Sequence, residues 1–147
     1  MGLPSTAHQT LVMWAVRKMQ ADGFVPMAHD GIIPQFDCER RLRYPPNLSG
    51  LRPDAVAFSP LLSTFAFAEA KTEEDLASEH TKNQLRRYAA LIGDRGLQTD
   101  CVYISTPRSA AMALDRLLRD LSLLSTRRIR RLHIPDCLVV DMRAAHA

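Results

Sequence analysis

The chain contains few cysteines and few aromatic residues, and each shortage argues against particular kinds of site. Only three of its 147 residues are cysteine, namely Cys38, Cys101 and Cys137, and they are too far apart to match a zinc site. An odd count fits a reducing compartment better than a disulfide framework, so we expect a cytoplasmic protein with Cys101 and Cys137 in its core. Aromatic residues amount to 6% and do not interleave with the arginines, which argues against a stacking surface for single-stranded bases.

Long apolar runs are also missing. No segment is long and apolar enough to span a membrane, and no signal peptide precedes the first expected helix, so we expect no membrane association. The length of 147 residues and the hydrophobic content of 46% are typical of one globular domain. We therefore predict a single domain over residues 1–147.

The basic residues exceed the acidic ones only slightly, 19 against 16, but they are clustered. Such clusters suit contacts with the phosphates of a nucleic acid. The alternative is a solvated surface or, for the last cluster, a basic linker between a helix and a strand. The clusters are Arg40, Arg41 and Arg43; Lys82, Arg86 and Arg87; and Arg127, Arg128, Arg130 and Arg131.

Hydrophobic periodicity predicts an α/β fold in which helices flank a mixed central β-sheet. Pro26 and Pro135 limit the first and last strands to edge or bulge positions. The expected elements are a helix over 5–22, a strand over 24–28, a loop over 29–50, a hairpin over 53–71, a helix reaching residue 92, a buried strand over 99–106, a helix over 108–124 and a strand over 132–141.

The hairpin is the most informative element. Large and small side chains alternate along both of its arms with a period of two, which is the period of a β-strand. We expect the hairpin to close around Leu61 and Leu62, although the loop residues do not fix the register uniquely and a one-residue slip would undo the alignment. The expected cross-strand pairs are Phe58 with Phe65, Val56 with Phe67, and Asp54 with Glu69.

This pairing predicts a metal site at the open end of the hairpin. Directly opposed residues have Cβ atoms about 4.5–5.5 Å apart, and Lys71 projects from the same face as Glu69 because it lies two residues further on. Two carboxylates this close repel each other unless a cation lies between them. We therefore expect Asp54 and Glu69 to bind Mg²⁺ or Mn²⁺, with Lys71 orienting water or neutralising a phosphate. The alternative is a solvated Glu69–Lys71 pair at a strand end.

Pro53-Asp54 followed by Glu69-Ala70-Lys71 resembles the PD-(D/E)xK nuclease superfamily. Gln84 and Tyr88, one helical turn apart, resemble the Q-xxx-Y motif of its RecB-type and Holliday-junction-resolvase-like branches. The resemblance covers about residues 5–106 and implies a restriction-endonuclease-like core of the order α-β-β-β-α-β, here followed by a further helix and strand.

The resemblance implies a nuclease that hydrolyses phosphodiester bonds in DNA with metal-activated water. Its implied metal ligands are Asp54, Glu69 and the backbone carbonyl of Ala70, while Lys71 and Gln84 complete the catalytic set. Tyr88 is implied to face either the nucleic acid or the core. Homodimerisation, or a place in a DNA-processing complex, would suit so small a chain. The residues expected to contact DNA are Tyr88, Arg40, Arg41, Arg43 and Arg87.

One departure from the family pattern concerns the first helix. Many members carry a metal-binding glutamate there, but no glutamate occurs between Ser5 and Asp22. His8 and Gln9 are poor substitutes for a hard-metal ligand, and we expect His8 only to lie near the helix N-terminus. This absence leaves two alternatives to the nuclease: an inactive nuclease-fold protein that binds nucleic acid or a partner, and a structural domain whose carboxylates bind nothing.

Overall fold

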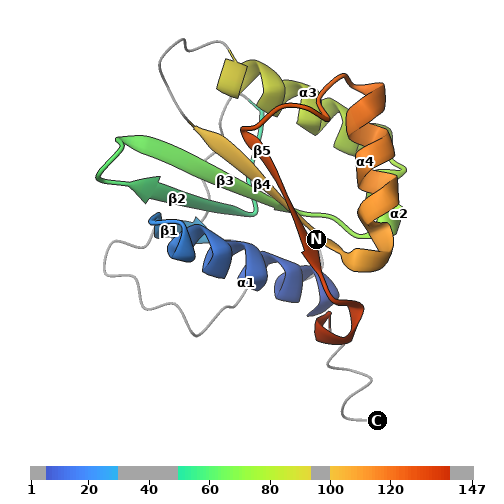
Figure 1. The fold of residues 1–147 in the computed structure, drawn as a ribbon, viewed down its shortest axis with the longest axis horizontal. Coiled ribbons are helices and arrows are strands. Elements are labelled where there is room, and N and C mark those ends of the chain that lie inside the picture. Colours follow the sequence, from blue (N-terminus) through green and yellow to red (C-terminus); the bar gives the residue numbers. More distant parts are fainter. Residues whose placement is uncertain (1–5, 30–49, 94–99, 140–147) are drawn as a thin grey trace.

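The computed structural model describes residues 6–29, 50–93 and 100–139, and these form one five-stranded mixed sheet (Figure 1). The first three strands are antiparallel, and the third, fourth and fifth are parallel, so the predicted mixed sheet is confirmed. In spatial order the strands are β1 (Val25–His29), β2 (Ala55–Ser59), β3 (Thr64–Ala70), β4 (Cys101–Pro107) and β5 (Ile129–Ile134).

Helices cover both faces of the sheet (Figure 1). One face carries α1 (Thr6–Ala21), close to the predicted helix over 5–22. The other face carries α2 (Glu73–Leu76), α3 (Glu79–Gly93) and α4 (Ala111–Asp120). The α/β architecture with flanking helices therefore agrees with the sequence-based prediction.

The alternation of small and large residues in the hairpin decides which helix packs on which face. The small residues face α1, and their short side chains let the helix pack closely against the sheet. Leu11 and Met19 of the helix are fully buried in this contact. Val56 and Phe67 face the opposite side and pack in the core formed with α3 and α4. The small residues are Ala55, Ala57, Ala66, Ala68 and Ala70.

Both edge strands contain or precede a proline, as predicted. In β1 the register shifts between Pro26 and Ala28, which is the expected bulge at an edge. The last strand was predicted over 132–141, but β5 begins at Ile129 and ends at Ile134, where Pro135 leads into a short 3₁₀ helix. The linker interpretation of the last basic cluster holds only for Arg127 and Arg128, because Arg130 and Arg131 lie in β5 and pair with β4.

The helices after the hairpin are shorter than their periodicity indicates. The helix expected to reach residue 92 is divided in two, because the Ser78 hydroxyl accepts a hydrogen bond from the Thr81 N–H (3.2 Å) and starts α3 anew. The helix expected over 108–124 consists of a 3₁₀ turn (Arg108–Ala110) and α4, and the chain then turns at Ser122 with φ of 58°. Cys101 is buried as expected, whereas Cys137 is exposed and does not join the core.

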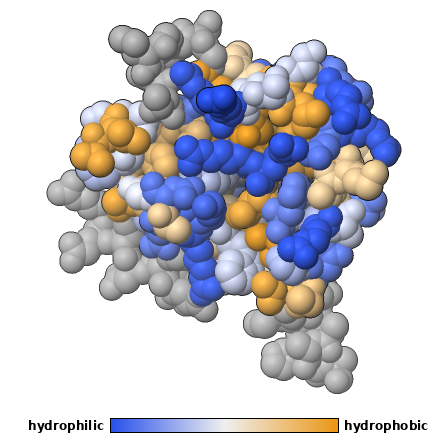
Figure 2. Space-filling view, viewed as in Figure 1, coloured by the Kyte–Doolittle hydropathy of each residue, from blue (hydrophilic) through white to orange (hydrophobic). Residues whose placement is uncertain are grey.

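The β2–β3 turn presents apolar side chains to the surface. Leu61 and Leu62 are 92% and 62% exposed. Figure 2 shows apolar side chains gathered over this turn, at the left edge of the view. No helix in the three described segments is long and apolar enough to cross a membrane.

Truncating the inner face of α4 should destabilise the fold, whereas truncating its outer face should not. Leu114 has no exposed surface, so Leu114→Ala should lower the free energy of unfolding by about 2–5 kcal/mol. Met112 on the same helix is 76% exposed, and Met112→Ala should change the free energy of unfolding by less than about 0.5 kcal/mol. Urea unfolding followed by circular dichroism measures both, and equal losses would contradict the packing of α4.

Candidate active site

Asp54 is held at the open end of the hairpin, directly before β2. The observed pairs Phe58 with Phe65 and Val56 with Phe67 confirm the predicted register of the two arms. The pairing ends at Ala55 and Ala68, and Asp54 and Glu69 are the next residues along the two arms. Two hydrogen bonds to β3 fix Asp54 there: its N–H donates to the Ala68 carbonyl (2.9 Å), and its Oδ2 accepts from the Ala70 N–H (2.8 Å). The carboxylate is therefore positioned by the hairpin itself.

Glu69 lies on β3 with only 2% of its surface exposed. The hydroxyl of Tyr88, on α3, donates a hydrogen bond of 2.7 Å to its Oε1. Its Oε2 is 3.8 Å from the ammonium of Lys71. Burial and the adjacent carboxylate also raise the pKa of Tyr88, so its hydroxyl keeps the proton that it donates.

Lys71 connects the end of β3 to α3. Its backbone N–H donates to the Ser105 carbonyl of β4 (3.0 Å), which keeps it in register one residue beyond the strand. Its ammonium donates to the Gln84 side-chain oxygen (2.5 Å). Gln84 and Tyr88 are one helical turn apart, so α3 contacts Lys71 with one side chain and Glu69 with the next.

A helix cap follows directly after Lys71. The Thr72 hydroxyl accepts from the Asp75 N–H (3.3 Å), and the Asp75 carboxylate accepts from the Thr72 N–H (2.9 Å), which together form a capping box. This cap begins α2 immediately beyond the site. The chain direction therefore changes at Thr72 and brings α3 back over the Glu69 face of the sheet.

His8 lies beside Asp54 and does more than begin the first helix. Its Nε2 is 3.2 Å from Asp54 Oδ2, although the side chain was expected only to lie near the N-terminus of α1. The hydrogen bond to Asp54 raises the pKa of His8, against the opposing effect of burial. A histidine in the first turn of α1 thus contacts the carboxylate cluster.

The two opposed carboxylates have pKa values that move apart. Burial raises the pKa of Glu69 well above its usual range, and the charge of Asp54 raises it further, against the lowering effect of Lys71. Burial alone would also raise the pKa of Asp54, but the hydrogen bond and charge of His8 and the Ala70 N–H outweigh it and lower the pKa. A cation bound between the two carboxylates would relieve the repulsion between their negative charges.

The donor set suits an oxygen-preferring divalent ion bound mostly by water. Within the described segments, no three or more His, Cys, Asp or Glu side chains are grouped so that they could hold a metal ion. Magnesium commonly uses only one or two protein carboxylates and takes its remaining ligands from water and phosphate. Asp54 and Glu69 meet that requirement, and the Ala70 carbonyl remains a predicted third oxygen.

The residues predicted to contact DNA differ in their placement. Tyr88 has no exposed surface, so its side chain faces the core and not a nucleic acid. Arg87 is exposed. A Cβ atom added to Gly50 would lie only 2.5 Å from the guanidinium of Arg87. Arg87 therefore lies beside the segment that leads to Asp54. The remaining three, Arg40, Arg41 and Arg43, lie outside the described residues.

The basic cluster near β5 is largely engaged with the protein itself. Three of its four arginines bind groups of other elements, which reduces its value as a phosphate-binding surface. The contacts are Arg128 with the Ile92 carbonyl, Arg130 with the Tyr103 hydroxyl and Asp22, and Arg131 with Asp115.

Comparisons with protein-family models, curated proteins and solved structures find no match for this chain. The functional interpretation therefore depends on the geometry of the site. The hairpin contributes Asp54, Glu69 and Lys71, α3 contributes Gln84, and α1 contributes His8.

Neutralising Glu69 should stabilise the protein in the absence of divalent cations. The pKa of Glu69 is raised in the folded state above its ordinary value of 4.5, so the unfolded chain loses this proton first and folding stability falls as pH rises past that value. Glu69→Gln should therefore raise the free energy of unfolding at pH 8 in EDTA by roughly 1 kcal/mol or more, and the gain should shrink toward pH 4. Urea titrations across this pH range measure the difference.

Glu79→Gln is the matched control, because Glu79 is exposed at the start of α3. It should change stability by less than about 0.5 kcal/mol at every pH. A Glu69→Gln variant less stable than the wild type at pH 8, or a gain that does not depend on pH, would contradict the buried like-charge pair.

Proposed function

We propose that this chain is a metal-dependent nuclease that hydrolyses phosphodiester bonds in DNA. The observation that carries the proposal is the meeting of two opposed carboxylates and a lysine at one end of the sheet. Asp54 and Glu69 lie close enough for the charge of Asp54 to raise the pKa of Glu69, and the Lys71 ammonium is 3.8 Å from Glu69. Two carboxylates for a cation and a separate cation for a phosphate are the groups that this reaction needs.

Each side chain has a distinct role in this proposal. Asp54 and Glu69, with the Ala70 carbonyl, hold Mg²⁺ or Mn²⁺, which when bound supplies an activated water and charge stabilisation at the phosphate. Lys71 orients the attacking water or neutralises the developing negative charge. Gln84 acts through Lys71, since its side-chain oxygen accepts the lysine's hydrogen bond and fixes the direction of the ammonium.

The fold supports a PD-(D/E)xK assignment and a restriction-endonuclease-like core. The order α1, β1, β2, β3, α3, β4 matches the order that the resemblance implies, and the motif residues lie on the corresponding elements. The exposure of Arg87 on α3, beside Gly50, supports a role for this residue in contacting a DNA backbone. We propose DNA as the partner, with selectivity for a branched or otherwise structured substrate as in the resolvase-like branch.

The burial of the site favours a second candidate, a nuclease-fold protein that binds DNA or a protein complex without cutting. Glu69 is 2% exposed and Lys71 is 8% exposed, so substrate approach is restricted to the side where Asp54 and His8 reach the surface. The contact between His8 and Asp54 also gives this carboxylate a partner from the chain itself. Such a protein would retain the fold and the DNA contacts but would have no hydrolytic activity.

Cleavage assays with matched variants separate the two candidates. The protein is incubated with supercoiled, linear, single-stranded and four-way-junction DNA in Mg²⁺, Mn²⁺ or EDTA. We expect metal-dependent cleavage of at least one substrate, and a loss of about 100-fold or more in Glu69→Ala and in Lys71→Ala, because each removes a group that stabilises the transition state.

Glu79→Ala and Lys18→Ala are the controls, since Glu79 is exposed at the start of α3 and Lys18 is exposed on α1 in an ion pair with Asp22. Both should retain cleavage within about threefold of the wild type. If no substrate is cut while DNA is still retarded in a gel, the non-catalytic candidate is correct. If cleavage persists in EDTA and in both site variants, the metal mechanism is wrong.

A further inference from the structure

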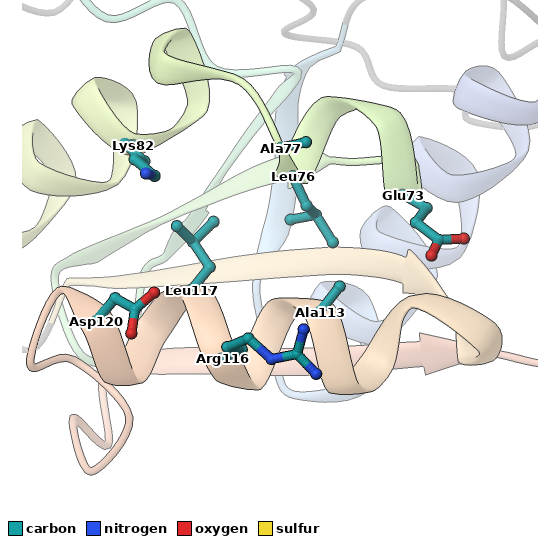
Figure 3. Close-up of a pocket in the computed structure, with 8 residues that line it drawn as sticks. All are labelled: Glu73, Leu76, Ala77, Lys82, Ala113, Arg116, Leu117 and Asp120. Atoms are coloured by element: carbon teal, nitrogen blue, oxygen red, sulfur yellow. The ribbon is translucent and has the colours of Figure 1, made fainter.

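A groove lies between α2 and α3 on one side and α4 on the other, and it contains none of the candidate active-site residues (Figure 3). Its volume is about 330 Å³. The apolar base is formed by Leu76 and Leu117, each 5% exposed, and the small residues Ala77 and Ala113 keep the walls low. An apolar base between low walls can receive side chains from another molecule.

Four charged side chains surround this base, and their signs alternate. The wall formed by α2 and α3 carries Glu73 at one end and Lys82 at the other, and α4 carries Arg116 and Asp120 in the opposite order (Figure 3). In the described part of the chain, Glu73, Arg116 and Asp120 have no ion-pair partner, and Lys82 pairs with Glu79. Three of the four charges of the groove are therefore available to an occupant.

The alternation restricts what the occupant can be. Two positive and two negative groups give the rim no net charge, so neither a polyanion such as DNA nor a strongly basic segment is favoured. Charge complementarity requires an occupant that also alternates in sign over the same distances. The chain itself carries such a surface, namely this groove.

We propose that the groove is the docking face for a second copy of this chain, related to the first by a two-fold axis. A two-fold interface uses the same patch on both protomers, so the patch must be complementary to itself. With the axis along the groove, Glu73 faces the partner's Arg116 and Lys82 faces the partner's Asp120. With the axis across the groove, Glu73 faces the partner's Lys82 and Arg116 faces the partner's Asp120. Either arrangement pairs opposite charges around a shared apolar centre.

Sedimentation velocity over a concentration series tests the docking face without any reference to DNA cleavage. The wild-type chain should form dimers, and Arg116→Glu should raise the dissociation constant at least about tenfold, because it sets like charges against each other twice across the axis. Arg119→Glu is the control: Arg119 is exposed on α4 outside the groove, so this variant should dimerise like the wild type. Circular dichroism establishes that each variant is folded.

Charge-swapped double variants identify the axis. Glu73→Lys combined with Arg116→Glu restores dimerisation if the axis runs along the groove, and Arg116→Asp combined with Asp120→Arg restores it if the axis runs across. Recovery in one of the two supports the proposal. A wild-type chain that stays monomeric up to about 1 mM, equal weakening by Arg116→Glu and Arg119→Glu, or recovery in neither double variant would overturn it.

Discussion

The repulsion between two opposed, buried carboxylates is the constraint on which the rest of the site depends. Asp54 and Glu69 come close together at the open end of the hairpin, and surrounding groups moderate the repulsion between them. The Ala70 N–H and His8 stabilise the charge of Asp54, while Tyr88 donates to Glu69. These groups come from three different elements, so the site assembles only when α1 and α3 have packed on opposite faces of the sheet. A divalent cation is the remaining group that such an arrangement favours.

The packing of the sheet explains why α1 and α3 deliver their side chains to this point. Alanines on one face of β2 and β3 let α1 approach closely, so its first turn, with His8, reaches Asp54. Larger residues on the other face, Phe67 among them, pack under Tyr88 of α3, which holds the helix over Glu69. One period-two pattern therefore fixes both the core and the position of the functional groups.

The observed hairpin register agrees with the sequence-based prediction, because a one-residue slip would turn the large side chains of one arm to the other face of the sheet. The pairing of Phe58 with Phe65 followed from the period-two pattern. The placement of His8 did not, because it depends on how closely a helix packs across a sheet. Two element boundaries were also not predicted, because neither of their causes alters hydrophobic periodicity. The break at Ser78 is caused by a local hydroxyl cap, and the early start of β5 at Ile129 is caused by pairing with β4. The sequence thus predicted the carboxylates and the lysine, but not the partner that α1 supplies.

Calorimetric titration with Mn²⁺ at pH 8 tests most directly whether the carboxylate pair is a cation site, because it requires no substrate. The wild type and the exposed control Glu79→Gln should each bind at least one Mn²⁺ per chain with equal affinity. Glu69→Gln should bind at least about tenfold more weakly, since it removes one of two charged ligands. Equal binding by all three proteins, or no binding by the wild type, would contradict the account.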